Sequence, residues 1–293
     1  MCGIAGVVQS GKAVSDPSDR LNRSLSSLSH RGPDGRGEMT WESVGGCRVD
    51  MGMTRLAVLD LSPSGQQPMT TPDGRFTVVF NGEITNFVEL RSELQREGVA
   101  FHSSGDTEVL LRAWEHWGAR CRHRLDGMYA FAVLDRHEAS LTLVRDPFGI
   151  KPLYIVQSNP DCLAFGSELR SLLPFLSSIP SLDWNVASRY LSTGLYDDGP
   201  QTFVDGIEHV APGSMVVVDL ETGEHRNVSP DWWPSLQTDE GLTLEQAADT
   251  VRDLLTQSVR RNLRSDVPVG IALSGGIDST AIVHLVRAIE PDL

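Results

Sequence analysis

Residues 128–144 read MYAFAVL-DRHEAS-LTLV, two apolar runs around a polar segment, and this stretch decides the fold. The runs 128–134 and 141–144 predict two strands, and the polar residues 135–140 predict the turn of a hairpin. Neither run alternates between apolar and polar residues, so both faces of these strands must be covered. We therefore predict an α+β domain with stacked sheets in the middle and helices on the outside.

Other segments supply the remaining layers of this domain. A strand is predicted at 76–80, running into Asn81-Gly82 as a turn, and another at 216–218. Three apolar stripes with helical spacing predict outer helices, the second ending at Gly98 and the third at Gly118. Their members are Leu21, Leu25 and Leu28; Phe87, Leu90 and Leu94; and Val109, Leu110, Ala113, Trp114 and Trp117.

Composition excludes several functional classes. The formal net charge is −14, with 25 basic and 39 acidic residues, which argues against binding to nucleic acid or to an anionic membrane. The longest apolar run is too short to span a membrane and no signal peptide is apparent, so we expect a soluble, cytoplasmic protein. The 4 cysteines lack C-x-x-C spacing, so neither a disulfide framework nor a zinc site is expected.

A second domain follows a predicted linker at 221–242. Thr243-Leu244-Glu245-Gln246 predicts a capping box at the start of a helix. A parallel-type strand at 267–273, the loop 274–280 and a helix to about Ile289 then make one half-unit of a doubly wound α/β domain. One strand and one helix are too few to enclose a site, so we expect this domain to be truncated; the sequence leaves open whether the chain is a fragment or a natural truncation.

Cys2 is a candidate nucleophile because it becomes the first residue once Met1 is removed. It then carries a thiol together with an α-amine, whose pKa of about 7.7–8.0 suits a general base near neutral pH. The alternative is a small residue that merely permits removal of the methionine. Cys2 by itself does not decide between the two interpretations.

Several segments together resemble one family, the glutamine-hydrolysing asparagine synthetases. They are Cys2-Gly-Ile-Ala-Gly6, His30-Arg-Gly-Pro-Asp34, Arg55-Leu56, Asn81-Gly-Glu-Ile84, Gly105-Asp-Thr-Glu108 and Arg145-Asp-Pro-Phe-Gly-Ile-Lys-Pro-Leu-Tyr154. Thr85 departs from the family, which usually has tyrosine there. The resemblance implies an N-terminal-nucleophile glutaminase sandwich (α-β-β-α) at 2–220, the linker, and the start of an ATP-pyrophosphatase-type synthetase domain at 243–293.

The resemblance also assigns roles in glutamine hydrolysis. Cys2 would attack the glutamine amide, and the Asn81 side chain and the Gly82 N–H would stabilise the oxyanion. Arg55 would bind the α-carboxylate and Asp106 the α-ammonium. Leu56, Ala57, Val58, Leu59 and Glu83 would complete the pocket. Arg145, Asp146 and Glu168 are expected to be structural, and Cys47, Cys121 and Cys162 inert.

The loop Ser274-Gly-Gly-Ile-Asp-Ser-Thr280 resembles the pyrophosphate-binding loop of ATP pyrophosphatases and lacks the Gly-Lys ending of a Walker A loop. Glycines at a strand–helix junction offer N–H groups to phosphate. Asp278 would bind Mg²⁺. The residues expected at ATP are Ala272, Leu273, Ser274, Gly275, Gly276, Asp278 and Ser279.

The leading hypothesis is therefore a glutamine-dependent amidotransferase that supplies ammonia for ATP-dependent conversion of aspartate to asparagine. One alternative is an amidotransferase of the same superfamily acting on another carboxylic acid. Another is a non-catalytic remnant that binds glutamine. The expected small molecules are glutamine, with ATP and aspartate in the complete enzyme; the glutaminase half needs no cofactor, and a homodimer is left open.

Overall fold

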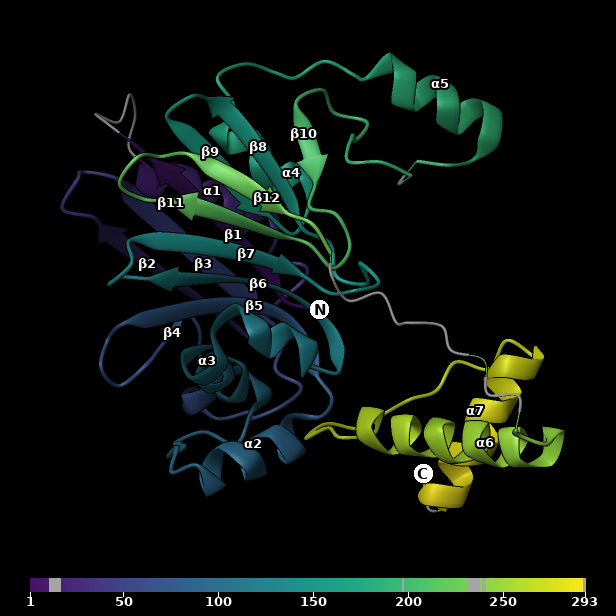
Figure 1. Ribbon diagram of the computed structural model, residues 1–293. Helices are drawn as coiled ribbons and strands as arrows, with labels where there is room; N and C mark the ends of the chain where they lie inside the picture. The colour runs from purple at the N-terminus through teal and green to yellow at the C-terminus, as the bar shows by residue number, and fades with distance from the viewer. Residues whose placement is uncertain (11–16, 197, 231–237, 239–240, 292–293) are drawn as a thin grey trace. The chain divides into compact units, whose positions relative to one another are not determined.

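The computed structural model describes residues 1–10, 17–196, 198–230, 238 and 241–291. The chain divides into two compact units, Met1–Trp232 and Trp233–Leu293. The first unit contains two six-stranded sheets, seen stacked in Figure 1. The first sheet has the order β10-β8-β9-β1-β3-β2, and the second has the order β12-β11-β7-β6-β5-β4.

All strand pairs within these sheets are antiparallel, with bounds as follows. The first sheet contains β1 (Gly3–Gln9), β2 (Gly35–Glu42), β3 (Arg48–Arg55), β8 (Tyr154–Asn159), β9 (Cys162–Gly166) and β10 (Ile207–His209). The second contains β4 (Met69–Thr70), β5 (Phe76–Ile84), β6 (Gly127–Asp135), β7 (Ser140–Arg145), β11 (Met215–Asp219) and β12 (His225–Val228).

Helices cover the outer face of each sheet. The α-helices of the first unit are α1 (Pro17–Ser27), α2 (Phe87–Arg96), α3 (Asp106–Trp117), α4 (Leu169–Leu172) and α5 (Trp184–Thr193). Short 3₁₀ helices are η1 (Pro63–Gly65), η2 (Gly118–His123) and η3 (Leu173–Phe175). Apolar residues of α2 and α3 pack on β5 and β6, and those of α1 pack on Ala5 of β1. This confirms the three helical stripes and the α+β sandwich.

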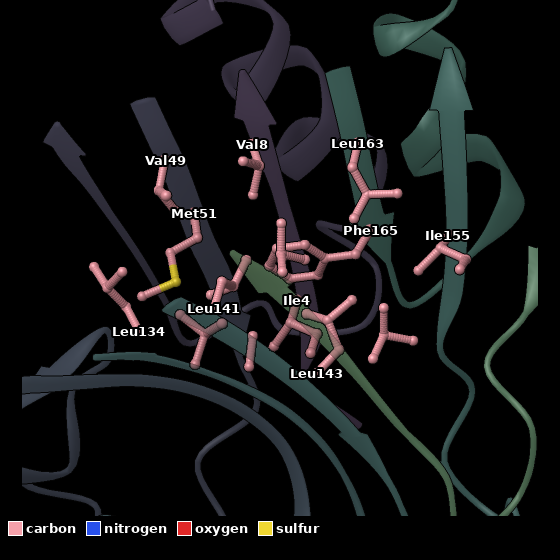
Figure 2. Close-up of a cluster of buried hydrophobic side chains, with 14 of the residues drawn as sticks. Ile4, Val8, Val49, Met51, Leu134, Leu141, Leu143, Ile155, Leu163 and Phe165 are labelled. Carbon is pink, nitrogen blue, oxygen red and sulfur yellow. The ribbon is translucent and has the colours of Figure 1, made fainter. Parts of the chain in front are cut away.

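The side-chain alternation of the hairpin strands explains their continuous apolar sequence. In β6, Ala130 and Leu134 face the core between the sheets, shown in Figure 2, whereas Phe131 and Val133 face the helices. Both sets are buried, because each face of the sheet has a covering layer. The predicted hairpin of β6 and β7 is confirmed, with Leu134 paired to Leu141.

The Asn81-Gly82 dipeptide does not form the predicted turn. It lies inside β5, where Gly82 pairs with Tyr129 of β6. The glycine serves close strand packing there, because a Cβ on Gly82 would overlap the carbonyl oxygen of Met128. The chain instead leaves the strand after Ile84 and enters α2.

The predicted linker at 221–242 contains a strand in its first part. β12 (His225–Val228) pairs with β11 and so belongs to the second sheet of the first unit. The later linker positions 231–237 and 239–240 lie outside the described residues.

The described residues of the second unit form two helices, α6 (Leu244–Asn262) and α7 (Ile277–Ile289). The predicted capping box is present: Thr243 Oγ1 accepts from the Gln246 N–H, and the Gln246 side chain accepts from the Thr243 N–H. The strand predicted at 267–273 does not form, since none of the described strands lies beside these residues to complete a ladder. In the described part of the chain, no helix is long and apolar enough to cross a membrane.

Candidate active site

A cavity of about 100 Å³ collects most of the residues that the sequence predicts to bind glutamine. Its walls come from the two residues before β1, the segment from the end of β3 onward, the second half of β5 and the start of α3. The predicted residues that line it are Cys2, Arg55, Leu56, Val58, Leu59, Asn81, Gly82, Glu83 and Asp106. Ala57 is the exception, and its N–H donates to Asp34 Oδ2 at 2.8 Å.

The Cys2 thiol lies directly before β1 and against the segment after β3. The Leu56 N–H donates to Sγ at 3.4 Å, and Sγ lies 3.6 Å from the Leu56 carbonyl oxygen. Burial raises the pKa of this thiol, while the Leu56 N–H and the nearby terminal ammonium oppose the rise. The thiol is therefore within reach of groups that favour a thiolate, but it needs a base to release its proton.

One edge of β5 directs its backbone N–H groups away from β6. The N–H of Phe80 donates to Gln67 Oε1 at 2.6 Å, and that of Ile84 donates to Asp106 Oδ2 at 2.9 Å. Since N–H groups two residues apart point the same way in a strand, the Gly82 N–H is directed to this edge as well. Gly82 lines the cavity together with Asn81.

The Asn81 side chain is fully buried, and within the described residues neither Oδ1 nor Nδ2 has a hydrogen-bond partner. A buried amide with both polar atoms unpaired is rare and costs about 1–3 kcal/mol per group. Asn81 lines the cavity, so a ligand or an ordered water bound there would supply the missing partners.

Arg55 brings a buried cation to the same cavity. Nη1 donates to the Ser62 carbonyl at 3.2 Å, while Nη2 donates to the carbonyls of Leu59 and Asp60. A guanidinium has five N–H donors, so Nε and one Nη1 hydrogen are left for a ligand. These three partners are neutral carbonyl oxygens.

Asp106 is the first residue of α3, and its buried carboxyl group accepts the Ile84 N–H. Burial raises the pKa of Asp106 to about 7, although the Ile84 N–H works in the opposite direction. A neighbouring carboxylate, Glu83, raises it further. A cationic ligand in the cavity would reverse this balance by favouring the charged form.

Sequence reasoning missed Asp60, which organises one wall. Burial opposes its ionisation, but hydrogen bonds from Ser62, Ser64 and the Ser104 N–H lower the pKa of Asp60 to about 2. Its backbone carbonyl accepts from Arg55, so this carboxylate ties the segment that holds the guanidinium. The signal was Asp60-Leu-Ser-Pro-Ser64, because aspartate followed by serine favours a turn closed by side-chain hydrogen bonds.

Lys151 is a second cation in the cavity wall that sequence reasoning did not place there. Asp146, fully buried, accepts from the N–H groups of Phe148, Ile150 and Lys151 at 2.9–3.0 Å and so shapes the loop before Lys151. Arg145 donates to the carbonyls of Gly149, Lys151 and Val210. Burial lowers the pKa of Lys151, and the charge of Glu83 partly restores it.

The predicted phosphate loop lies in the second unit. Gly275 has a φ of +85°, Gly276 caps α7, and the Ser274 and Ser279 hydroxyls are 2.9 Å apart. Ala272, Leu273, Ser274, Gly275, Gly276 and Asp278 are exposed. A glycine-rich turn before a helix N-terminus and one carboxylate fit a Mg²⁺-bound phosphate, since Mg²⁺ is usually held by one or two carboxylates and the phosphates themselves.

Comparisons with known proteins give the class of domain that this sandwich and its cavity form. The family model of the glutamine amidotransferase domain matches residues 1–233, and the asparagine synthase model matches residues 250–293. The chain belongs to the glutamine amidotransferase family, joined to the start of an asparagine synthase domain.

Known proteins similar to this chain carry related names. Asparagine synthetase (glutamine-hydrolysing) 1 of Bacillus subtilis is 35% identical over an alignment of 301 positions, which covers 100% of this chain and 45% of that protein. Asparagine synthetase (glutamine-hydrolysing) 2 of the same organism is 33% identical over 97% of this chain and 38% of its own length. The chain thus spans about half the length of these curated relatives or less.

The fold is shared with a solved structure described as the allosteric regulatory enzyme of purine biosynthesis. That structure matches with a TM-score of 0.56 at 18% identity, over 98% of this chain and 63% of the other. At this identity the match supports the sandwich fold alone.

Proposed function

We propose that the chain hydrolyses glutamine at Cys2 and supplies ammonia to an ATP-dependent reaction that converts aspartate to asparagine. The observation that carries the first half is the buried, unpaired Asn81 amide in the same cavity as Cys2. The second half is supported by the asparagine synthase match at 250–293 and by the names of the relatives.

The geometry supports a defined chemistry. After removal of Met1, the Cys2 α-amine takes the thiol proton and Sγ attacks the side-chain carbonyl carbon of glutamine. The developing oxyanion accepts from Asn81 Nδ2 and the Gly82 N–H. The carbon–nitrogen bond breaks, the amine returns the proton, and ammonia leaves; water then hydrolyses the γ-glutamyl thioester to glutamate and free Cys2.

Recognition of glutamine uses the two ends of its α-amino acid group. The remaining Arg55 donors suit the carboxylate, and the Asp106 carboxylate suits the ammonium. Leu56, Ala57, Val58 and Leu59, with Glu83, complete the pocket, four of these five lining the cavity. Arg55 bonds neutral carbonyl groups, and the pKa of Asp106 is raised. Both observations support binding of a zwitterionic ligand, whose carboxylate would pair with Arg55 and whose ammonium would pair with Asp106.

In the second domain, Ser274, Gly275, Gly276 and Ser279 would hold ATP phosphates and Asp278 would hold Mg²⁺, with Ala272 and Leu273 beside the nucleotide. Bound Mg-ATP supplies the activation of the acceptor carboxylate. We place the domains at 2–220, 221–242 and 243–293, with β12 attached to the first. We also place the protein in the cytoplasm, which four free cysteines support.

The decisive experiment is the release of ammonia from glutamine by the purified chain, with glutamate formed in equal amount. Labelling of Cys2 by a glutamine-derived diazoketone, prevented by excess glutamine, would locate the reaction. A chain that binds glutamine without releasing ammonia would be the non-catalytic alternative and would overturn the proposal.

A further inference from the structure

The nucleophile occupies a position that needs unusual support. β1 begins at Gly3, so Cys2 precedes the strand, and in a chain that starts at Cys2 this residue has a covalent neighbour on one side only. Chain ends fray unless they are tied down. A thiol that must meet a substrate carbon at about 3–3.5 Å therefore needs contacts that hold its backbone.

Arg31 supplies such a contact from a distant part of the sequence. Its Nε donates to the Cys2 carbonyl oxygen at 2.8 Å, and its side chain is only 9% exposed. This bond holds the backbone of Cys2, whereas the Leu56 N–H contacts its sulfur atom. The direction of the Arg31 guanidinium thus contributes to the direction of the Cys2 side chain.

Glu168 holds that guanidinium. Arg31 Nη1 donates to Glu168 Oε1 at 2.9 Å. The planar guanidinium is therefore held by two hydrogen bonds, one from Nε to Cys2 and one from Nη1 to the carboxylate. His30 Nε2 lies 2.9 Å from the same oxygen, and Arg170 Nε is 2.8 Å from the other. The hydrogen bonds from Arg31 and His30 lower the pKa of Glu168, although burial opposes them, so the carboxylate is charged.

Glu168 is itself tied to the strand that carries Cys2. The Ser167 N–H donates to the Ile4 carbonyl at 2.9 Å, and the Ile4 N–H donates to Ser167 Oγ at 2.9 Å. Gly166 pairs with Ala5 in the same register. Contacts from Glu168 therefore reach Cys2 by two routes, through Arg31 and through β1.

We propose that Glu168 is a positioning residue for the Cys2 nucleophile and acts through Arg31. The proposal rests on the proposed glutaminase function. It differs from the expectation that Glu168 is merely structural, because it predicts a loss in the chemical step and not only in stability.

Glu168→Ala should lower kcat for glutamine hydrolysis roughly 10- to 100-fold, the cost of disturbing a partner that orients a reacting group. KM should change less than about twofold, because Glu168 does not line the cavity. Glu168→Gln keeps an acceptor for Arg31 without the charge and should restore part of the lost kcat. All variants are measured at equal folded fraction, verified by thermal unfolding.

A two-probe labelling experiment distinguishes positioning from reactivity. A glutamine-derived diazoketone must be aligned with Sγ, whereas iodoacetamide needs only an accessible thiolate. Glu168→Ala should slow labelling of Cys2 by the diazoketone much more than labelling by iodoacetamide. Equal slowing of both would indicate a change in thiol reactivity and would contradict the proposal.

A matched control is Asp135→Asn, which weakens another arginine–carboxylate pair. Arg75 Nε and Nη2 contact Asp135 at 3.0 and 2.8 Å, and neither residue lines the cavity. This variant should lower the unfolding temperature without a comparable loss of kcat. If Glu168→Ala behaves like Asp135→Asn, Glu168 is structural only and the inference fails. If the unmodified chain releases no ammonia, the proposed function fails instead.

Discussion

The Asp106 carboxylate accepts a 2.9 Å hydrogen bond from the backbone N–H of Ile84, two residues beyond Gly82 on one edge of β5. Two strand residues span about 6.6 Å, so the proposed oxyanion donor and the proposed ammonium site are set apart by the strand itself. In the proposed binding mode, β5 therefore fixes the distance between the groups that bind the two ends of the substrate. The following predictions test the parts of this arrangement.

Cys2→Ala should abolish ammonia release and diazoketone labelling, because no sulfur remains to form the thioester. Cys2→Ser should be nearly as inactive, since the hydroxyl is a far weaker nucleophile than a thiolate at neutral pH. Glutamine-dependent ammonia release is the measurement. Retained release in Cys2→Ala would exclude the proposed mechanism.

Asn81→Ala should lower kcat roughly 10²- to 10³-fold, the usual cost of one oxyanion donor. The stability of the empty protein should change little or rise, because the variant removes two buried atoms that have no partner. Steady-state kinetics and thermal unfolding measure both effects. A change confined to KM would remove Asn81 from the oxyanion site.

Arg55→Lys should raise KM for glutamine more than its unchanged charge suggests. An ammonium group has three donors, so it cannot bond the loop carbonyls of 59–62 and also present the two further N–H donors that the guanidinium has left. KM and glutamine affinity by calorimetry are the readouts. Arg75→Lys is the control, since Arg75 contacts Asp135 and lies outside the cavity. Unchanged affinity in Arg55→Lys would place the carboxylate elsewhere.

The pH dependence of glutamine capture should report Asp106. Burial raises its pKa to about 7 in the empty cavity. Below that pH the carboxyl is protonated and cannot pair with the α-ammonium, so kcat/KM should fall as pH decreases through about 7. The profile of kcat should be flatter there, because bound ammonium lowers the pKa of the carboxyl. Asp106→Asn should lower kcat/KM and remove this acidic step; if the step persists, another group titrates.

The 293-residue chain incubated with glutamine, aspartate and Mg-ATP should form glutamate and ammonia without AMP. The loop 274–280 is mostly exposed, and no described strand lies beside the preceding residues, so nothing there encloses a reacting carboxylate. Chromatographic assay of AMP and pyrophosphate is the measurement. AMP formed in step with aspartate would show that the loop suffices.

Much of the sandwich was predictable, because strands that are buried on both faces are apolar at every position. The β6–β7 hairpin could be predicted from two continuous apolar runs around a polar turn, and the helix with Phe87, Leu90 and Leu94 from its apolar periodicity. Asn81-Gly82 misled because the dipeptide favours turns locally, whereas pairing with β6 continues the strand through it. Tertiary packing against Met128 and Tyr129 overrides the local preference.

The site was predictable residue by residue only through the family resemblance. Spacing could not bring Asp60 or Lys151 to the cavity, since their placement depends on loops shaped by their own hydrogen bonds. Spacing also could not show that the Asn81 side chain has no hydrogen-bond partner among the described residues, because this depends on which side chains lie near it in the folded protein. At 267–273 the apolar sequence favours a strand, but a ladder also needs a second strand beside it.

β12 covers the edge of the apolar strand β11 and is itself the edge strand of the second sheet. A chain cut at residue 220 would retain every residue of the cavity and yet lose the strand that pairs with Met215–Val218. The apolar β11 would then become an open edge, able to recruit a second molecule by backbone pairing and to start aggregation. A chain that keeps β11 paired on both sides therefore extends at least to Val228, beyond all the residues of the cavity.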